Sequence, residues 1–96
     1  MIANTFTMLP GRGLLGMGGA DAIEFLQNLI SNDVEKVAPD ASIYGLLLTA
    51  QGKFLHDFFI AQRGDGTLVL DCEGDRLDDL ERRLTLYRLQ SNVTFR

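Results

Sequence analysis

The chain has 96 residues, of which 46 % are hydrophobic and 23 % charged, and its net charge is −4. This balance is typical of one small soluble domain, and the acid excess argues against a grip on a nucleic-acid backbone driven by charge. Its apolar runs are too short for a membrane span, and one cysteine with one histidine excludes an intrachain disulfide and a structural zinc site. Because the first residues lack the pattern of a signal peptide, we expect a cytoplasmic location.

The first third of the chain predicts two short strands and a helix. Apolar residues 5–9 and 13–17 flank a Pro-Gly pair, which indicates strands around a turn. A helix is predicted over residues 20–30, where apolar residues follow helical spacing: Ile23, Leu26, Leu29 and Ile30. Asp21 and Glu24, three residues apart, resemble an acidic capping arrangement at its start.

The remainder predicts three antiparallel strands, a second helix and a final strand. Residues 43–49 and 54–62 flank a polar turn with Gly52 at the bend, and the turn at 64–66 introduces a strand over 67–72. A helix then opens at 73–75, with one apolar stripe formed by Leu77, Leu80 and Leu84. Asn92 ends this helix, and residues 93–95 begin another strand. The order β-β-α-β-β-β-α-β predicts an α+β fold, a largely antiparallel sheet with two helices over one face.

Strands at the ends of the chain need partners. We expect residues 5–9, 13–17 and 93–95 to pair outside a single isolated half. The chain is therefore expected to be the N-terminal part of a longer protein, or a protomer of a strand-exchanged homodimer.

Two polar residues stand together in the second hairpin strand, His56 and Asp57. Successive strand residues point to opposite faces, so at least one of the two must face an apolar layer or a pocket. Burying an unpaired carboxylate is costly, and such a residue needs a partner or a function.

Three blocks carry a family resemblance: GADAIEFLQNLISNDV, YGLLLTAQGKFLHDFFI and DGTLVLDCEGDRLDDLERRLTLYRL. In this order they resemble the start of the YgfZ-type folate-binding proteins, which belong to the superfamily of the glycine-cleavage T-protein, an aminomethyltransferase. The resemblance covers residues 14–95. It implies that residues 1–96 form the N-terminal half of a folate-binding domain built from two β2-α-β3-α halves.

The resemblance also implies a function. It points to a tetrahydrofolate-binding accessory protein that supports iron–sulfur cluster assembly or repair and, through it, tRNA modification, with folate and iron–sulfur proteins as partners. The alternative is the start of a folate-dependent aminomethyltransferase. T-proteins carry two adjacent aspartates where this chain has His56-Asp57, and the cysteine motif K-G-C-Y-x-G-Q-E of the YgfZ-type branch is absent from these residues. We expect no catalytic activity from the chain alone, and we predict no metal ligand.

The tetrahydrofolate-binding residues implied by the resemblance are Asp57, His56, Lys53, Gln51 and Arg88. Asp57 would accept the N–H groups of the pterin or a reacting amine, and Lys53 would meet the glutamate tail. Arg88 would clamp a carboxylate, or it would only favour the helix C-terminal dipole.

Each of these residues also has a structural interpretation. Asp57 can be an edge-strand acid paired with Arg63 or Lys53, a surface pair worth under about 1 kcal/mol. His56 can be a packing residue among phenylalanines. Cys72, flanked by two acids, is predicted to be structural.

Overall fold

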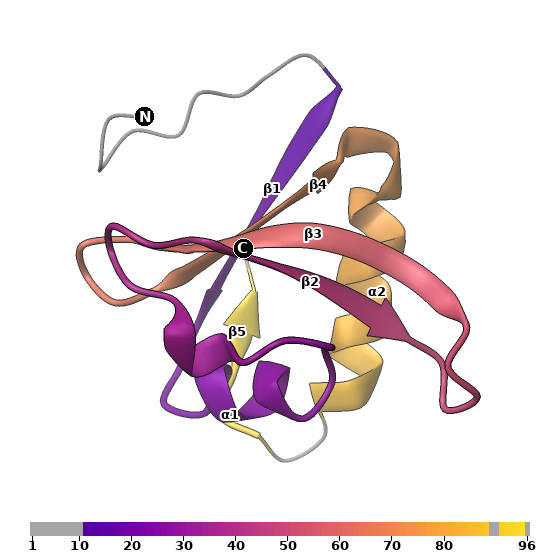
Figure 1. Cartoon of the computed structure of the whole chain (residues 1–96), viewed down its shortest axis with the longest axis horizontal. Coiled ribbons are helices and arrows are strands. Elements are labelled where there is room, and N and C mark those ends of the chain that lie inside the picture. The colour runs from indigo at the N-terminus through magenta and orange to yellow at the C-terminus, as the bar shows by residue number, and fades with distance from the viewer. Residues whose placement is uncertain (1–10, 89–90, 96) are drawn as a thin grey trace.

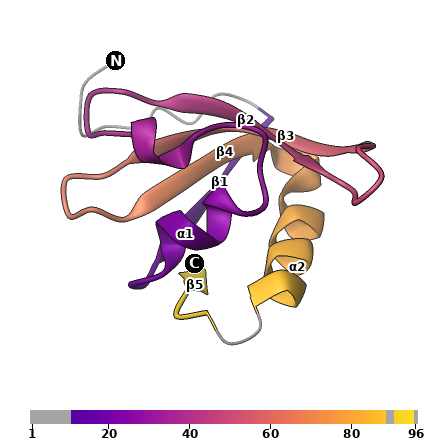
Figure 2. The ribbon, with the colours of Figure 1, turned by 60° about the horizontal axis from the view of Figure 1, so that its bottom comes forward.

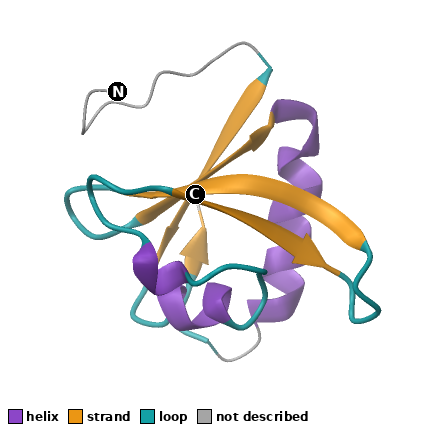
Figure 3. Ribbon diagram, in the orientation of Figure 1, coloured by secondary structure: helices purple, strands orange, loops and turns teal. Residues whose placement is uncertain are grey.

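The computed structural model describes residues 11–88 and 91–95, which form one antiparallel sheet with helices (Figures 1 and 3). The elements in chain order are β1 (Arg12–Gly18), α1 (Ala22–Gln27), the 3-10 helix η1 (Val34–Lys36), β2 (Ile43–Leu48), β3 (Phe54–Gln62), β4 (Leu68–Glu73), the 3-10 helix η2 (Gly74–Arg76), α2 (Leu77–Arg88) and β5 (Thr94–Phe95). The five strands are ordered β2-β3-β4-β1-β5, and every neighbouring pair is antiparallel. The predicted α+β fold is confirmed; the predicted strand over 5–9 lies outside the described residues.

Both helices pack on the same face of the sheet (Figure 2). Leu80 and Leu84 of α2 are fully buried, so the apolar stripe predicted for this helix is confirmed. Buried residues of four strands meet the helices in this core: Leu15, Met17, Leu47, Phe58, Ile60 and Leu70. Within the described residues no helix covers the opposite face, which we call the open face. Nor is any described helix long and apolar enough to cross a membrane.

The first helix is shorter than predicted. It ends at Gln27. Beyond it the Ile30 N–H still donates to the Leu26 carbonyl at 3.0 Å, but Ile30 also forms an isolated β-bridge with Leu47. Ile30 thus leaves the helix to pair with the sheet. The buried residues of α1 include Phe25 and Leu26, whereas Ile23 is 36 % exposed, so the predicted stripe was wrong at Ile23.

The start of α1 is fastened to the far end of the chain. Asp21 makes no capping hydrogen bond, contrary to the prediction. Instead its carboxylate accepts the Asn92 N–H at 2.8 Å, and its own N–H donates to the Asn92 carbonyl at 3.1 Å. Gly19 allows this approach: its φ is +105°, and a Cβ there would lie 2.2 Å from the Asn92 carbonyl oxygen.

The end strands pair with each other. β5 joins β1 through Met17 opposite Phe95 and Gly18 opposite Thr94, while β1 also pairs with β4 along most of its length. The expectation that residues 13–17 and 93–95 pair outside the chain is therefore wrong. A short final strand needs only two positions of β1, and the contact between Asp21 and Asn92 brings it there.

Candidate functional site

The β2–β3 turn presents two of the predicted site residues to solvent. The turn closes through the Thr49 N–H, which donates to the Lys53 carbonyl at 2.8 Å, and Gly52 bends the chain with φ +84°. Gln51 and Lys53 are exposed, and no ion pair or side-chain hydrogen bond of the described residues holds either side chain. The turn therefore leaves both side chains unconstrained.

Histidine 56 faces the helices. It is 2 % exposed, and its Nε2 lies 2.7 Å from Oδ2 of Asp79 on α2. Since a carboxylate only accepts, Nε2 carries the hydrogen. The expectation that one residue of the pair faces an apolar layer is confirmed, and His56 is the one that does.

The same carboxylate also joins two arginines of α2. Asp79 accepts from Arg83 Nε at 2.8 Å and from an Arg82 terminal nitrogen at 2.6 Å. These bonds hold the pKa of the Asp79 carboxyl well below its usual range; the Arg83 bond contributes most, followed by those from His56 and Arg82. The carboxylate stays ionised and ties α2 to β3.

Aspartate 57 points to the open face. Its Oδ2 accepts the Tyr44 hydroxyl at 2.6 Å, and this bond is the largest cause of a raised pKa of Tyr44. β3 lies between β2 and β4, but at Asp57 it pairs only with β2, opposite Leu46, and its register with β4 begins at Phe59. The carboxylate's side-chain partner is Tyr44, neither Arg63 nor Lys53.

Aromatic and charged groups surround this carboxylate. The Tyr44 and Phe59 rings pack with centroids 5.1 Å apart, and the two side chains are 43 % and 48 % exposed. Phe59 stands opposite Asp71 of β4, whose carboxylate accepts from Arg12 Nε of β1 at 2.9 Å. We call Arg12, Tyr44, Asp57, Phe59 and Asp71 the open-face cluster. It combines apolar ring faces with carboxylate acceptors, a combination that suits a flat heteroaromatic ligand carrying N–H donors.

Arginine 88 lies elsewhere. At the end of α2 it donates to the Val93 carbonyl at 3.3 Å, and its guanidinium sits 5.8 Å from the centre of the Phe95 ring. It therefore joins the helix to the segment around β5, and the structure does not bring it to the open-face cluster. Cys72 is buried, and burial is the main cause of the raised pKa of its thiol, as a structural cysteine requires.

Sequence reasoning missed Tyr44, Phe59, Asp71 and Arg12. Tyr44 and Phe59 lie inside apolar runs, where an aromatic residue indicates no more than a strand. The signal was available in the turn: with Gly52 at the bend, antiparallel pairing and the period of two place Tyr44 and Asp57 on one face. Arg12 and Asp71 meet only through the non-sequential pairing of β1 with β4.

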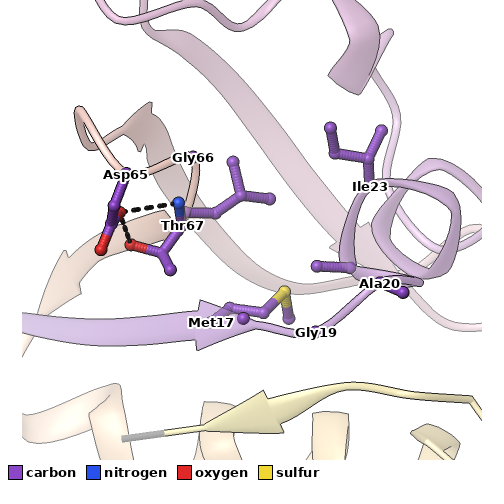
Figure 4. A pocket seen from close by; sticks show the side chains of 10 residues that line it. Met17, Gly19, Ala20, Ile23, Asp65, Gly66 and Thr67 are labelled. Atoms are coloured by element: carbon purple, nitrogen blue, oxygen red, sulfur yellow. Dashed lines mark hydrogen bonds between the residues drawn. The ribbon is translucent and has the colours of Figure 1, made fainter.

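Hollows in the described surface are small. One of about 70 Å³ is bordered by both His56 and Asp57, with Phe54, Glu73 and Arg76. Another, of about 240 Å³, lies between the β1–α1 and β3–β4 turns and is lined by Met17, Gly19, Ile23 and Thr67 among others (Figure 4). In it Asp65 accepts from the Thr67 hydroxyl at 2.7 Å and from its N–H at 3.0 Å, which lowers the pKa of Asp65. Both are below the roughly 300–1,000 Å³ of a small-molecule pocket, and neither encloses the open-face cluster.

No family model matches the chain. It is 28 % identical over 96 residues to the mitochondrial iron-sulfur cluster assembly factor IBA57 homolog of Neurospora crassa, covering 94 % of this chain and 22 % of that protein. It is 32 % identical over 63 residues to a probable aminomethyltransferase of Thermococcus gammatolerans, covering 66 % of this chain and 16 % of that protein. Among solved structures it is similar to the glycine cleavage system aminomethyltransferase T of Bartonella henselae, with TM-score 0.79 and 18 % identity over 88 % of this chain and 24 % of that one.

Two statements follow from these likenesses. The chain has the fold of part of a glycine-cleavage T-protein, and it spans about a quarter or less of the length of these proteins. The expected cytoplasmic location is contradicted, because the names of the fungal relatives place them in mitochondria. Lack of a secretory pattern does not distinguish the cytosol from mitochondria.

Proposed function

We propose that this chain is the N-terminal half of the folate-binding domain of an accessory protein of the YgfZ type. In this proposal the protein binds tetrahydrofolate and supports iron–sulfur cluster assembly or repair and, downstream of it, tRNA modification. The likeness to the assembly factor of Neurospora crassa supports the iron–sulfur part, since it extends over 94 % of the chain. The same relatives favour a mitochondrial setting and iron–sulfur proteins as partners.

The open-face cluster is the observation that carries the folate part. A pterin is a flat ring with N–H donors, and the cluster offers the exposed rings of Phe59 and Tyr44 beside the carboxylates of Asp57 and Asp71. Asp71 is already paired with Arg12, so Asp57 is the acceptor left for the ligand. When bound, tetrahydrofolate supplies a carrier for one-carbon units. The chain's own part is to stack the ring and to accept its N–H groups, while residues beyond this half complete the site.

A folate-dependent aminomethyltransferase is the second candidate, favoured by the likeness to the protein of Thermococcus gammatolerans. Position 56 separates the two candidates. His56 is buried and bonded to Asp79, so the first acid of the T-protein pair has no counterpart there. A histidine fits beside the ionised Asp79, where a second carboxylate would be repelled. We therefore favour the accessory protein.

Calorimetric titration with tetrahydrofolate tests the folate part, using the complete protein as its gene encodes it. Asp57→Ala is expected to weaken binding about tenfold or more, because it removes an ionised acceptor. The matched control is Asp78→Ala, which removes the same charge from an exposed position of α2 and should bind like the wild type. Equal affinity of Asp57→Ala and the wild type would remove Asp57 from the site.

A cellular experiment tests the choice between the two candidates. In cells that lack the protein, the activities of iron–sulfur enzymes should fall, and the purified protein should not transfer an aminomethyl group from the glycine-cleavage carrier to tetrahydrofolate. Unchanged iron–sulfur enzymes together with measurable transfer would establish the second candidate instead.

A further inference from the structure

We infer that Tyr44 is a positioning residue, which holds the Asp57 carboxylate in the orientation that the ligand meets. The inference rests on the proposed function, since it assigns a role within the same site. It concerns the hydroxyl group of Tyr44 rather than its ring.

Among the described residues, the Tyr44 hydroxyl has one hydrogen-bond partner. It donates to Oδ2 of Asp57 at 2.6 Å, across the hairpin from β2 to β3. Among the described residues nothing donates to Oδ1, which remains for an incoming N–H group. The terminal torsion of an aspartate is broad, so a half-exposed carboxylate without a partner would sample many orientations. A hydrogen bond to one oxygen restricts where the other can point.

Tyr44 can act in this way because it is itself held. Its ring packs against Phe59 at 5.1 Å, and its carbonyl accepts from the Asn32 side chain at 2.9 Å. The neighbouring Leu46 donates its N–H to the Ser31 hydroxyl at 3.1 Å and accepts from the Ser31 N–H, also at 3.1 Å. Residues 31 and 32 thus run along the outer edge of β2 and fix the strand that carries the tyrosine.

Packing alone does not account for this contact. Tyr44 is 43 % exposed, and a phenylalanine would make the same ring contact with Phe59. Only the hydroxyl reaches Asp57. The raised pKa of Tyr44, caused chiefly by this bond, makes it observable by spectroscopy.

A double-mutant cycle on the complete protein provides the first test, with tetrahydrofolate as the probe in calorimetry. Tyr44→Phe should weaken binding about three- to tenfold, the net effect of one typical hydrogen bond at a half-exposed position. In an Asp57→Ala background, the same substitution should change nothing further, because no carboxylate remains to be positioned. Tyr87→Phe is the control: it removes the same hydroxyl from the chain's other tyrosine, which is also 43 % exposed, and should bind like the wild type.

The outcomes separate this inference from the proposed function. If Asp57→Ala binds normally, the folate site is wrong and the inference is overturned with it. If Asp57→Ala weakens binding but Tyr44→Phe does not, the site stands and the inference is overturned alone. Equal effects of Tyr44→Phe with and without Asp57 would assign the tyrosine a packing role and would also overturn it.

A titration without ligand is the second test. The difference in ultraviolet absorbance between the complete protein and its Tyr44→Phe variant follows the ionisation of Tyr44, with circular dichroism to verify the fold. Replacing Asp57 by Asn should lower the titration midpoint of Tyr44 towards the ordinary value of 10.0. An unchanged midpoint in folded protein would show that the hydrogen bond is absent, and the inference would be overturned.

Discussion

Leucine 80 offers the sharpest test of the packing between α2 and the sheet. Its side chain is fully buried in the core, on the stripe that also carries Leu84. Truncation to alanine removes the methine carbon and both methyl groups from a closed interior and leaves a cavity. We expect Leu80→Ala to lower the free energy of unfolding by about 2–5 kcal/mol.

This loss is large for a domain of this size. Native domains are stable by only about 5–15 kcal/mol, and each kcal/mol shifts the melting temperature of a 60–100-residue domain by about 4–8 °C. The melting temperature of Leu80→Ala should therefore fall by at least about 8 °C. Urea unfolding followed by circular dichroism gives the free energy directly.

Leu86→Ala is the matched control. It is the same substitution in the same helix, but Leu86 is 65 % exposed, so its effect should stay within about 0.5 kcal/mol. A loss below about 2 kcal/mol at Leu80, or equal losses at both leucines, would mean that the helix presents a different face to the sheet.

Two further predictions concern the backbone and acid. In urea unfolding, Gly19→Ala should destabilise the chain by more than Gly66→Ala. Both positions have positive φ, but only at Gly19 would a new Cβ meet backbone, 2.2 Å from the Asn92 carbonyl oxygen. Equal losses would mean that the segment around Asn92 moves away from the new Cβ at no cost. Since the pKa of Asp79 is lowered by folding, its stabilisation is present above the ordinary value of 3.8 and is lost as the pH falls further. Asp79→Asn should therefore reduce the slope with which the free energy of unfolding falls at acid pH, whereas Asp78→Asn should not. A slope of wild-type steepness in Asp79→Asn would refute the role of this carboxylate.

The fold could be predicted from the sequence where the signals are local. Gly52 and Gly66 mark both hairpin turns and have φ of +84° and +90°, and the leucine spacing of α2 gives its buried stripe correctly. The errors arise where distant segments compete. Ile30 has helical spacing, yet it forms a β-bridge with Leu47, a partner 17 residues away. Asp21 has the form of a cap, yet it bonds to Asn92.

The residues of the candidate site likewise divide into those that a local sequence signal reveals and those that depend on pairing between distant segments. Asp57 could be singled out because a carboxylate in an apolar strand is conspicuous, whereas Tyr44 and Phe59 stand out only once the register of the hairpin places them on the same face as Asp57. Arg12 and Asp71 are 59 positions apart and meet through the pairing of β1 with β4. Such a pair depends on the topology of the whole sheet, which no spacing rule contains.

His56 and Asp57 lie on opposite faces of β3, so the register of this strand decides which of them faces the open face. A slip of one residue in strand register would turn Asp57 into the core and His56 outward. The pairing with β2 is already irregular between Leu47 and Leu48, close to the turn, so the turn alone does not hold the register. On the helix side, buried Phe58 and the bond from His56 to Asp79 resist the slip, because it would expose the Phe58 ring, break the His56–Asp79 bond and take Asp57 away from Tyr44. Buried Phe58 and the His56–Asp79 bond thus favour the register that keeps Asp57 on the open face, where the Tyr44 hydroxyl reaches it.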